Sequence, residues 1–296
     1  MRKLPTEKRA SILSALVEGN SINATVRMCG VSKITVLRLL ADAGQFCADY
    51  HDVYVRGLAS KRVQADEIWA FCGCKDKAKK AGVSGHGSVW TWVAMDADSK
   101  LAISYVVGAR GEEYAIAFAH DIADRVGDRI QLSTDGLNIY ADAIDGAFHG
   151  EIDYAQIVKT FGQPGGTDDE RRYSPAECNG CRKVVKAGEP DLDYASTSYI
   201  ERQNLTMRMS IRRMTRLTNG YSKKIENHQH ATSLHFFHYN FIRKHHTIKT
   251  TPAVAAGIAN APMTVLDLVK MIEAEEAKLG GRLTDYLPAA KYGADS

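Results

Sequence analysis

The chain has 296 residues, 45% of them hydrophobic and 25% charged, and its formal net charge is +3 at pH 7. These values are ordinary for a globular protein with room for one to three domains. No apolar run is long enough to cross a bilayer, and residues 1–10 lack the apolar core of a signal peptide. The six cysteines are too few for a disulfide scaffold in a chain of this length. We therefore expect a cytosolic protein without membrane partners, whose cysteines are thiols or metal ligands.

Residues 1–50 have the pattern of a small helical module. Ser21 can cap a short helix that Gly30 ends, and Ser32 can cap the next helix, which runs to Gly44. A short helix, a glycine-containing turn and a second capped helix are typical of a helix-turn-helix DNA-binding module, although any small helical hairpin can share the pattern. The second helix would offer four polar side chains to DNA: Ser32, Lys33, Thr35 and Arg38.

A polar linker is predicted at 51–62. After it, the residue pattern changes from one typical of helices to one typical of strands. Alternating, β-branched and aromatic residues predict three strands, then an amphipathic helix and a fourth strand. The predicted ranges are 63–73, 88–97 and 100–110 for the three strands, 112–126 for the helix and 129–134 for the fourth strand.

The rest of the chain predicts one more strand and mostly helices. Residues 162–196 are rich in proline, glycine and charge, and we interpret them as an insertion. The predicted strand lies at 151–161, and the helices lie at 138–147, 197–219, 226–246, 251–258 and 265–279. The predicted fold is α/β, a mixed sheet flanked by helices after an N-terminal all-α module. The sheet domain would cover 63–260, and a C-terminal helix and tail would cover 261–296.

The predicted helix at 197–219 has two distinct faces. At about 100° per residue, one face is an apolar stripe that needs a core to pack against, whereas another carries a single acid, Glu201, at the head of a row of arginines. Such a face is often only solvated, but the excess of arginine favours a polyanion such as DNA. The stripe contains Ile200, Met207, Ile211 and Met214, and the helix carries Arg202, Arg208, Arg212, Arg213 and Arg216.

Three acids stand out by their positions. Asp66 lies inside a predicted strand, Asp135 lies where the fourth predicted strand ends, and Glu201 lies in the first turn of a helix. Each has an ordinary alternative explanation, namely an edge strand, a turn and the helix dipole. Carboxylates that converge at one sheet edge bind hard cations such as Mg²⁺. Two such ions about 3.5–4 Å apart catalyse phosphodiester cleavage in several enzyme classes.

Several motifs occur in an order that resembles a known family. The motifs are ADEIWAFCG, WTWVAMDADSKLAISYVVGAR, LSTDGLNIY, SYIERQNLTMRMSIRRMTRLTN and FFHYNFIRKHHTIKTTPAVAAG. Together with the strand order they resemble DDE transposases and retroviral integrases of the RNase H-like fold. More narrowly, they are similar to bacterial insertion-sequence transposases of the insertion-sequence-one type. The resemblance covers roughly residues 60–260.

The resemblance implies a metal-binding catalytic triad of Asp66, Asp135 and Glu201, with two Mg²⁺ or Mn²⁺ ions. It implies that Arg208 and Arg212 contact the transposon end. The expected partners are double-stranded DNA, as terminal inverted repeats and target, and further copies of the chain in a homodimer or larger synaptic assembly. The expected location is the bacterial cytoplasm, at the nucleoid. A DNA-binding regulator without catalysis and a stand-alone nuclease remain alternatives.

One departure from the family pattern concerns the third acid. The gap between Asp135 and Glu201 is long for compact members of the group, which we attribute to the insertion at 162–196. If the alignment were different, Glu170 or Glu177 would be the third acid. We favour Glu201 because the run YIERQNLTMR matches and because a helix holds a ligand more firmly than a loop does.

Two further sets of residues have ligand chemistry. A four-thiolate zinc site would need Cys72 and Cys74 together with Cys178 and Cys181, although reduced thiols are the ordinary explanation. Histidines cluster late in the chain. His238 and His246 are the candidates for an auxiliary role in proton transfer.

Overall fold

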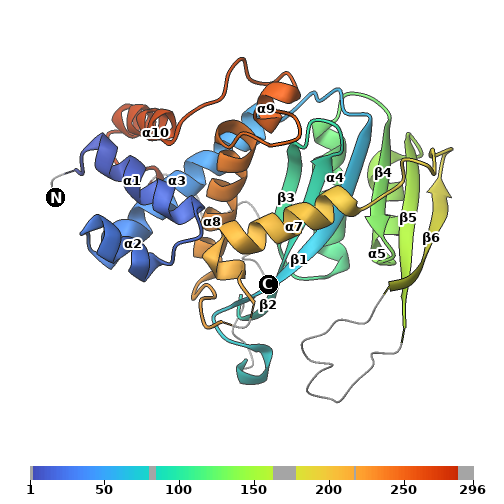
Figure 1. Ribbon diagram of the computed structural model, residues 1–296, viewed down its shortest axis with the longest axis horizontal. Coiled ribbons are helices and arrows are strands. Elements are labelled where there is room, and N and C mark those ends of the chain that lie inside the picture. Colours follow the sequence, from blue (N-terminus) through green and yellow to red (C-terminus); the bar gives the residue numbers. More distant parts are fainter. Residues whose placement is uncertain (1–2, 80–84, 163–177, 217, 286–296) are drawn as a thin grey trace.

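The computed structural model describes residues 3–79, 85–162, 178–216 and 218–285. A group of helices lies beside a twisted sheet that carries helices on both faces (Figure 1). The architecture is therefore α/β with a mixed sheet, as the sequence predicts. Within the described ranges, no helix is long and apolar enough to cross a membrane.

Three helices open the chain: α1 (Thr6–Val17), α2 (Ile22–Cys29) and α3 (Lys33–Tyr54). The predicted caps form, because Ser21 accepts a 3.1 Å bond from the N–H of Ala24 and Ser32 accepts one of 3.1 Å from Thr35. Gly30 ends α2 in the left-handed conformation with φ 59°. The described geometry is a capped helix pair, and its DNA-binding role stays a prediction.

Helix α3 continues ten residues past its predicted end at Gly44 and enters the predicted linker. Gly44 is a packing glycine rather than a helix terminator. A Cβ at this position would lie 2.4 Å from the Cα of His230 on α8 (Ile225–Phe237). The missing side chain therefore allows the backbones of α3 and α8 to approach closely.

Six strands form one sheet in the order β3-β2-β1-β4-β5-β6. Strand β4 runs parallel to its neighbours β1 and β5, and the other pairs are antiparallel. The first five strands in this order are compatible with an RNase H-like fold. The strands are β1 (Arg62–Cys72), β2 (Gly87–Asp96), β3 (Ala102–Gly108), β4 (Ile130–Asp135), β5 (Ile152–Phe161) and β6 (Cys178–Ala187).

Strand β6 lies within the segment 162–196 that we interpret as an insertion, so this segment is not loop throughout. It pairs with β5, with Ala155 opposite Val185 and Val158 opposite Arg182. None of its side chains is buried, so it lacks the alternation of apolar and polar residues that marks a half-buried strand. Backbone pairing to β5 holds it at the sheet edge.

The two faces of the sheet are covered by different helices. Trp92 packs against Phe118 of α4 (Glu112–Arg125) and Tyr140 of α5 (Ile139–Phe148), with ring centroids 6.0 and 5.4 Å apart. On the other face, Ile200 and Met207 of α7 (Ser198–Ser210) are fully buried in a cluster with β1 and β2. The predicted apolar stripe therefore anchors α7 on the sheet.

The chain after α8 widens into a π-helical turn, His238–Ile242, and becomes extended at Arg243, so the predicted helix at 226–246 is shorter than expected. Two more helices follow, α9 (Pro252–Ala255) and α10 (Val265–Leu279), and α10 has the predicted bounds. Buried Arg9 of α1 joins Glu273 and Glu276 of α10 at 3.1 and 2.6 Å. The C-terminal helix thus packs on the N-terminal helices.

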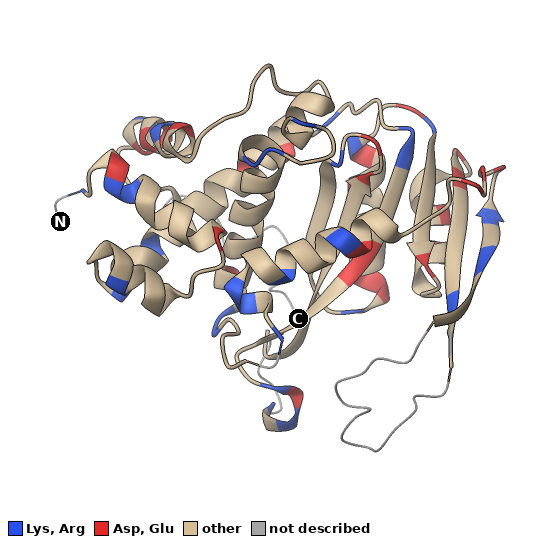
Figure 2. Cartoon of the chain, viewed as in Figure 1, with Lys and Arg blue, Asp and Glu red and all other residues tan. Residues whose placement is uncertain are grey.

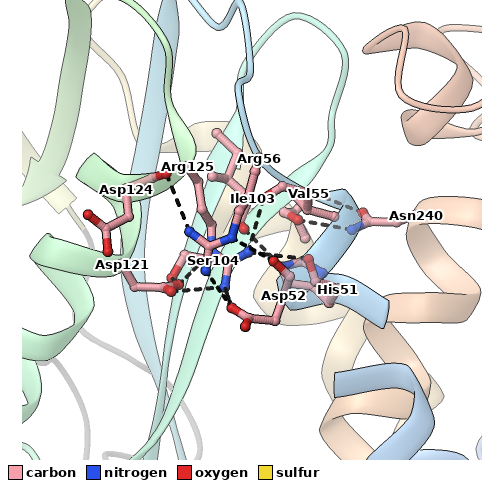
Figure 3. Close-up of polar contacts among 11 residues, drawn as sticks. His51, Asp52, Val55, Arg56, Ile103, Ser104, Asp121, Asp124, Arg125 and Asn240 are labelled. Atoms are coloured by element: carbon pink, nitrogen blue, oxygen red, sulfur yellow. Dashed lines mark hydrogen bonds and ion pairs between the residues drawn. The ribbon is translucent and has the colours of Figure 1, made fainter. Parts of the chain in front are cut away.

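A polar cluster joins α3 to the sheet (Figure 3). The guanidinium of Arg125 bonds Asp121 at 2.8 and 2.9 Å and Asp52 at 3.2 Å, and it also donates to the carbonyls of His51 and Val55. The side-chain amide of Asn240 pairs with both backbone groups of Ala102 on β3 at 3.0 and 2.9 Å. One hydrophobic core also runs from α1 to β4 and α5. The N-terminal helices and the sheet are therefore tied by both apolar and polar contacts.

Candidate active site

Asp66 and Asp135 lie on neighbouring parallel strands. The register pairs Ala65 with Thr134, which places the two aspartates side by side at the next position. Strand β4 ends at Asp135, whose Oδ1 accepts a 3.0 Å bond from the N–H of Leu137, whereas β1 continues to Cys72. The sheet thus presents two carboxylates at the carboxyl end of β4, where parallel strands commonly place ligand-binding residues.

The carboxylate of Asp66 is held on both oxygens. Its Oδ1 accepts from the N–H of Glu67 at 2.9 Å, and its Oδ2 accepts from Nδ2 of Asn204 on α7 at 2.8 Å. Burial, the charges of Glu67 and Asp135 and, less strongly, that of Glu201 raise the pKa of Asp66 to about 7. The site concentrates more negative charge than its surroundings compensate.

Glu67 is a site residue that the sequence did not single out. Among the described residues, Asp66, Glu67 and Asp135 form the one group of three or more acidic, His or Cys residues with potential ligand atoms all within 4.8 Å of each other. The Glu67 side chain is 2% exposed. Its oxygens bind Arg110 at 2.6 Å and the hydroxyl of Tyr140 at 3.1 Å. Burial and the charge of Asp135 raise the pKa of Glu67 above its ordinary value, and the contacts with Arg110 offset part of this rise.

Alternation along a strand explains why Glu67 was missed. Neighbouring residues of a strand point to opposite faces, so Asp66 turns toward α7 and Glu67 toward Tyr140 of α5. That rule predicts separate environments for the two acids. Strand β4 ends beside this point, and Asp135 approaches both carboxylates. A signal was available in two consecutive acids within a strand that, between Val63 and Cys72, is otherwise apolar apart from Gln64.

Glu201 lies in the first turn of α7, as predicted, and is half-exposed. Its Oε1 accepts from Thr197 at 2.5 Å and pairs with the ammonium of Lys159 on β5. It lines the same cavity as Asp66, of about 590 Å³, which we call the acidic cavity. Besides these two acids, the acidic cavity is lined by Glu67, Ile68, Trp69, Trp90, Asn204, Leu205, Arg208 and Arg216.

A residue of β1 fixes the start of α7, together with the hydroxyl of Ser196, which accepts a 3.1 Å bond from the N–H of Ser198. The side-chain oxygen of Gln64 accepts from the N–H groups of Tyr199 and Ile200 at 2.8 and 3.2 Å. Gln64 is buried and lies two residues before Asp66 on the same face of β1. One strand therefore supplies both a carboxylate and the acceptor that positions the helix carrying Glu201.

The predicted single helix at 197–219 is wrong beyond Ser210. Ile211 leaves the helical conformation with ψ 99°, and a 3₁₀ turn follows at Arg212–Met214. The guanidinium of Arg208 bonds the carbonyls of Met214 at 3.0 Å and Trp69 at 3.2 Å, which ties this turn back to α7 and β1. The arginines therefore do not form a continuous row on one helix face.

The five arginines occupy different environments. Burial and nearby Arg216 lower the pKa of Arg208 to about 10, and burial lowers that of Arg213 to about 10. Arg213 donates to Ser222 at 2.9 Å. Arg216 is exposed at the acidic cavity, Arg202 is exposed on the other side of α7, and Arg212 is half-buried beside the N-terminal helices.

The four cysteines proposed for zinc do not come together. Cys72 is buried at the end of β1 near Cys74, whereas Cys178 and Cys181 are exposed on β6. Strands β4 and β5 lie between β1 and β6. The described residues hold no cysteine group that could bind a metal. The spacing suggested ligands, but the pairs belong to distant strands.

The remaining predicted site residues have been placed as follows. Lys33 and Arg38 are exposed on α3, whereas the hydroxyls of Ser32 and Thr35 bond each other within the helix cap at 2.9 Å. His238 is buried, with a pKa lowered to about 4 chiefly by burial. Neither it nor His246 lines the acidic cavity. Glu170 and Glu177 lie outside the described residues.

The donor set fits a hard divalent cation such as Mg²⁺ or Mn²⁺. The ligand atoms available are carboxylate oxygens, which these ions prefer over nitrogen or sulfur. The hydrogen bonds described above use Oδ1 of Asp135 and Oε1 of Glu201, so the second oxygen of each has no partner among the described residues. A cation would also offset the crowding of charge that raises the pKa of Asp66.

Acidic segments on the sheet and on α7 lie together near the centre of the molecule, with basic segments on α7 and on the loop after α8 (Figure 2).

No protein-family model matches the chain, and no curated protein matches it. Solved structures that match include a piggyBac transposase synaptic complex with hairpin DNA, at TM-score 0.38 and 9% identity over 98% of this chain and 75% of that chain.

Two further matches are Mos1 complexes. The Mos1 transposase paired-end complex with left transposon end matches at TM-score 0.20 and 12% identity, over 50% of this chain and 58% of that chain. The Mos1 Strand Transfer Complex matches at TM-score 0.22 and 10% identity, over 79% and 78%. Scores this low carry no conclusion for this chain, so we argue its function from its own residues.

Proposed function

We propose that the protein is a DNA transposase that cuts DNA at transposon ends and joins the cut ends to a target. The supporting observation is the acidic cavity. Asp66 and Glu201, far apart in the chain, open onto it, and Asp135 lies beside Asp66 at the end of β4. The five-strand order and the motif resemblance favour phosphodiester chemistry over other uses of grouped carboxylates.

The residues of the cavity would divide the work as follows. When bound by Asp66 and Asp135, a divalent ion supplies Lewis-acid chemistry, activating a water or a 3′-hydroxyl and stabilising the leaving oxygen. Asn204 keeps Asp66 oriented through its 2.8 Å bond. Arg208 and Arg216 place positive charge at the cavity, where the scissile phosphate would lie.

Glu201, rather than Glu67, is our choice for the third metal-binding carboxylate. Both oxygens of Glu67 are held, by Arg110 and Tyr140, and its side chain is buried. Glu201 keeps one oxygen free of contacts among the described residues and is half-exposed in the cavity. We assign Glu67 a positioning role, in which it fixes the strand end and limits the approach of Asp135.

The surrounding parts of the chain would bind the DNA. Lys33 and Arg38 on α3 are exposed where a helix-turn-helix module presents its second helix. Residues 1–50 would recognise the terminal repeats, residues 63–260 would carry catalysis, and α10 would support the N-terminal helices. Because strand transfer joins two ends, we expect at least a dimer in the synaptic complex.

The test incubates the full chain with labelled terminal-repeat DNA and a target plasmid, in Mg²⁺ or in Ca²⁺. We expect strand transfer in Mg²⁺ that is lost in Asp66→Asn, Asp135→Asn and Glu201→Gln. Glu113→Gln, an exposed acid on α4 away from the cavity, is the matched control and should keep full activity.

Other outcomes would change the assignment. Tight DNA binding without cleavage would favour a regulator, and cleavage without joining would favour a nuclease. Activity that survives Glu201→Gln but is lost in Glu67→Gln would make Glu67 the third carboxylate. Activity lost in neither variant would leave the third acid to the residues outside the described ranges.

A further inference from the structure

A second cavity, of about 520 Å³, lies on the other side of α7. We call it the basic cavity. Its lining comes from the turn between β2 and β3, from α7 and from the loop after α8, so three separate parts of the chain build it. No carboxylate lines it within the described residues. The cationic and imidazole side chains are Lys100, Arg202, Arg243, Lys244, His245 and His246.

Lys100 is held at the basic cavity by fixed contacts of the fold. The residue is only 6% exposed and has a left-handed backbone, with φ 63°. Its ammonium donates to the carbonyl of Ala97 and lies 3.2 Å from the centroid of the Tyr199 ring. No ion pair joins it to a carboxylate of the described chain. A buried ammonium without a counter-charge is costly, and a bound anion would offset that cost.

The loop that supplies the other cations is held in place by its own backbone. The N–H of Arg243 bonds the carbonyl of His238 at 2.8 Å, and the N–H of His245 bonds that of Thr250 at 2.7 Å. Lys249 closes the loop in a left-handed conformation, φ 59°, with a 2.9 Å bond to the carbonyl of His245. The cationic side chains therefore project from a fixed turn.

The cations of the basic cavity are also uncompensated. Arg202, Arg243 and Lys244 form no ion pair with any described carboxylate, whereas Arg62, Arg110, Arg125 and Arg129 elsewhere each pair with an acid. Burial and then the charges of Lys100, Arg243 and His246 lower the pKa of His245, as expected in a positive field. The arrangement suits an anion with several oxygens.

We propose that the basic cavity binds a backbone phosphate of the DNA strand that reacts in the acidic cavity. This inference rests on the proposed function. Glu201 and Arg202 are consecutive on α7 and line the two cavities in turn. A helix is about 10–12 Å wide. One DNA strand advances about 3.4 Å per nucleotide along its axis, so a strand that crosses α7 would place a phosphate about three nucleotides away over Lys100.

The test measures binding of a fluorescein-labelled duplex to the full chain by anisotropy, in Ca²⁺ so that cutting does not interfere. The variant is Arg243→Gln with Lys244→Gln, both exposed and outside the core. The control, Lys186→Gln with Lys270→Gln, removes the same charge from two exposed sites on β6 and α10, neither of which lines the basic cavity.

We expect the cavity variant to bind duplex about tenfold more weakly than wild type near 0.1 M salt, and the slope of log affinity against log salt to fall by about 1 per lost phosphate contact. The control should change affinity by less than about twofold, as expected for charges that do not touch phosphate. Lys100→Gln, if it folds, should match the cavity variant.

Two results would overturn the proposal. One is wild-type duplex binding that the cavity variant and the control weaken equally. The other is thermal stabilisation by inorganic phosphate that requires Arg243 and Lys244 while duplex binding does not, which would assign the cavity to a free anion. Absence of duplex binding in wild type would instead refute the proposed function itself, so the two failures can be told apart.

Discussion

Arg125 of α4 is the residue whose loss should most weaken the contact between α4 and the end of α3. Its side chain is 5% exposed, and its guanidinium makes two bonds to Asp121, one to Asp52 and two to backbone carbonyls at the end of α3 (Figure 3). Replacement by leucine removes all five bonds. It leaves Asp121, 12% exposed, with the hydroxyl of Ser104 as its remaining side-chain partner among the described residues.

The expected loss for Arg125→Leu is about 3–5 kcal/mol in the free energy of unfolding, the range for a buried ion pair that loses one partner. Arg56 offers a matched control, because it pairs with Asp52 in the same cluster at 2.6 Å but is 40% exposed. Arg56→Leu should cost only about 0.2–1 kcal/mol, since water already screens that pair. The two variants remove the same chemical group from one cluster and differ mainly in burial.

The measurement is urea denaturation of wild type, both single variants and the double variant Asp121→Leu with Arg125→Leu. The double variant should regain part of the loss, because no unpaired buried charge remains. A cost for Arg125→Leu below about 1 kcal/mol, or equal to that of Arg56→Leu, would refute the reasoning. A double variant less stable than Arg125→Leu alone would show that lost packing, rather than the stranded carboxylate, sets the cost.

Three further predictions concern acid stability, helix packing and helix positioning. Burial lowers the pKa of His51, His228 and His235 to about 3. Below pH 6.5 these histidines are therefore protonated in the unfolded chain but stay neutral in the folded chain. Each should lower the free energy of unfolding by about 2 kcal/mol between pH 7 and pH 5. Urea midpoints that do not fall over this range would contradict it. Gly44→Ala should lower the free energy of unfolding by about 1–3 kcal/mol, because the added Cβ meets the backbone of α8. An unchanged thermal midpoint would show that the two helices can separate at no cost. Gln64→Leu should lower the free energy of unfolding by about 1–2 kcal/mol, because two N–H groups of α7 lose their acceptor. It should also slow strand transfer. Full activity and stability in this variant would show that packing alone positions α7.

Local patterns were sufficient to predict most of the sheet. Strands β1 to β5 alternate or are rich in β-formers, and their predicted bounds lie within two residues of the observed ones. Strand β6 was not predicted, because none of its side chains is buried on either face and its sequence therefore shows no alternation of apolar and polar residues. Its position depends on hydrogen bonds to β5, a partner that local sequence does not reveal.

Helix ends were harder to predict, for a related reason. Gly44 resembles a terminator in sequence, but close packing against His230 explains it better. Ser210 shows no breaker, yet α7 ends there, and Arg208 bonds both to the turn that follows and to the carbonyl of Trp69 on β1. In both cases a contact from a distant element overrides the local preference.

The candidate site was predicted in part. The register of β1 and β4 brings Asp66 and Asp135 together, as expected for acids on adjacent parallel strands. Glu67 and Gln64 were missed because their roles depend on partners far along the chain, Arg110 and the start of α7. The zinc hypothesis failed for the opposite reason, since good spacing within each cysteine pair says nothing about the distance between the pairs.

Helix α7 lines both cavities, so the positions of the acid and the arginine that it carries there are coupled. Its apolar stripe is fixed to the sheet, and Gln64 fixes its first turn, so Glu201 and Arg202 have little freedom to move independently. A shift that brings Glu201 closer to Asp66 also moves Arg202 relative to Lys100. The two deep acids are set by strand register. Under the proposed function, the metal ligand Glu201 and the phosphate contact at Arg202 would lie on one fixed helix, so we expect a substitution that displaces α7, such as Gln64→Leu, to weaken both together.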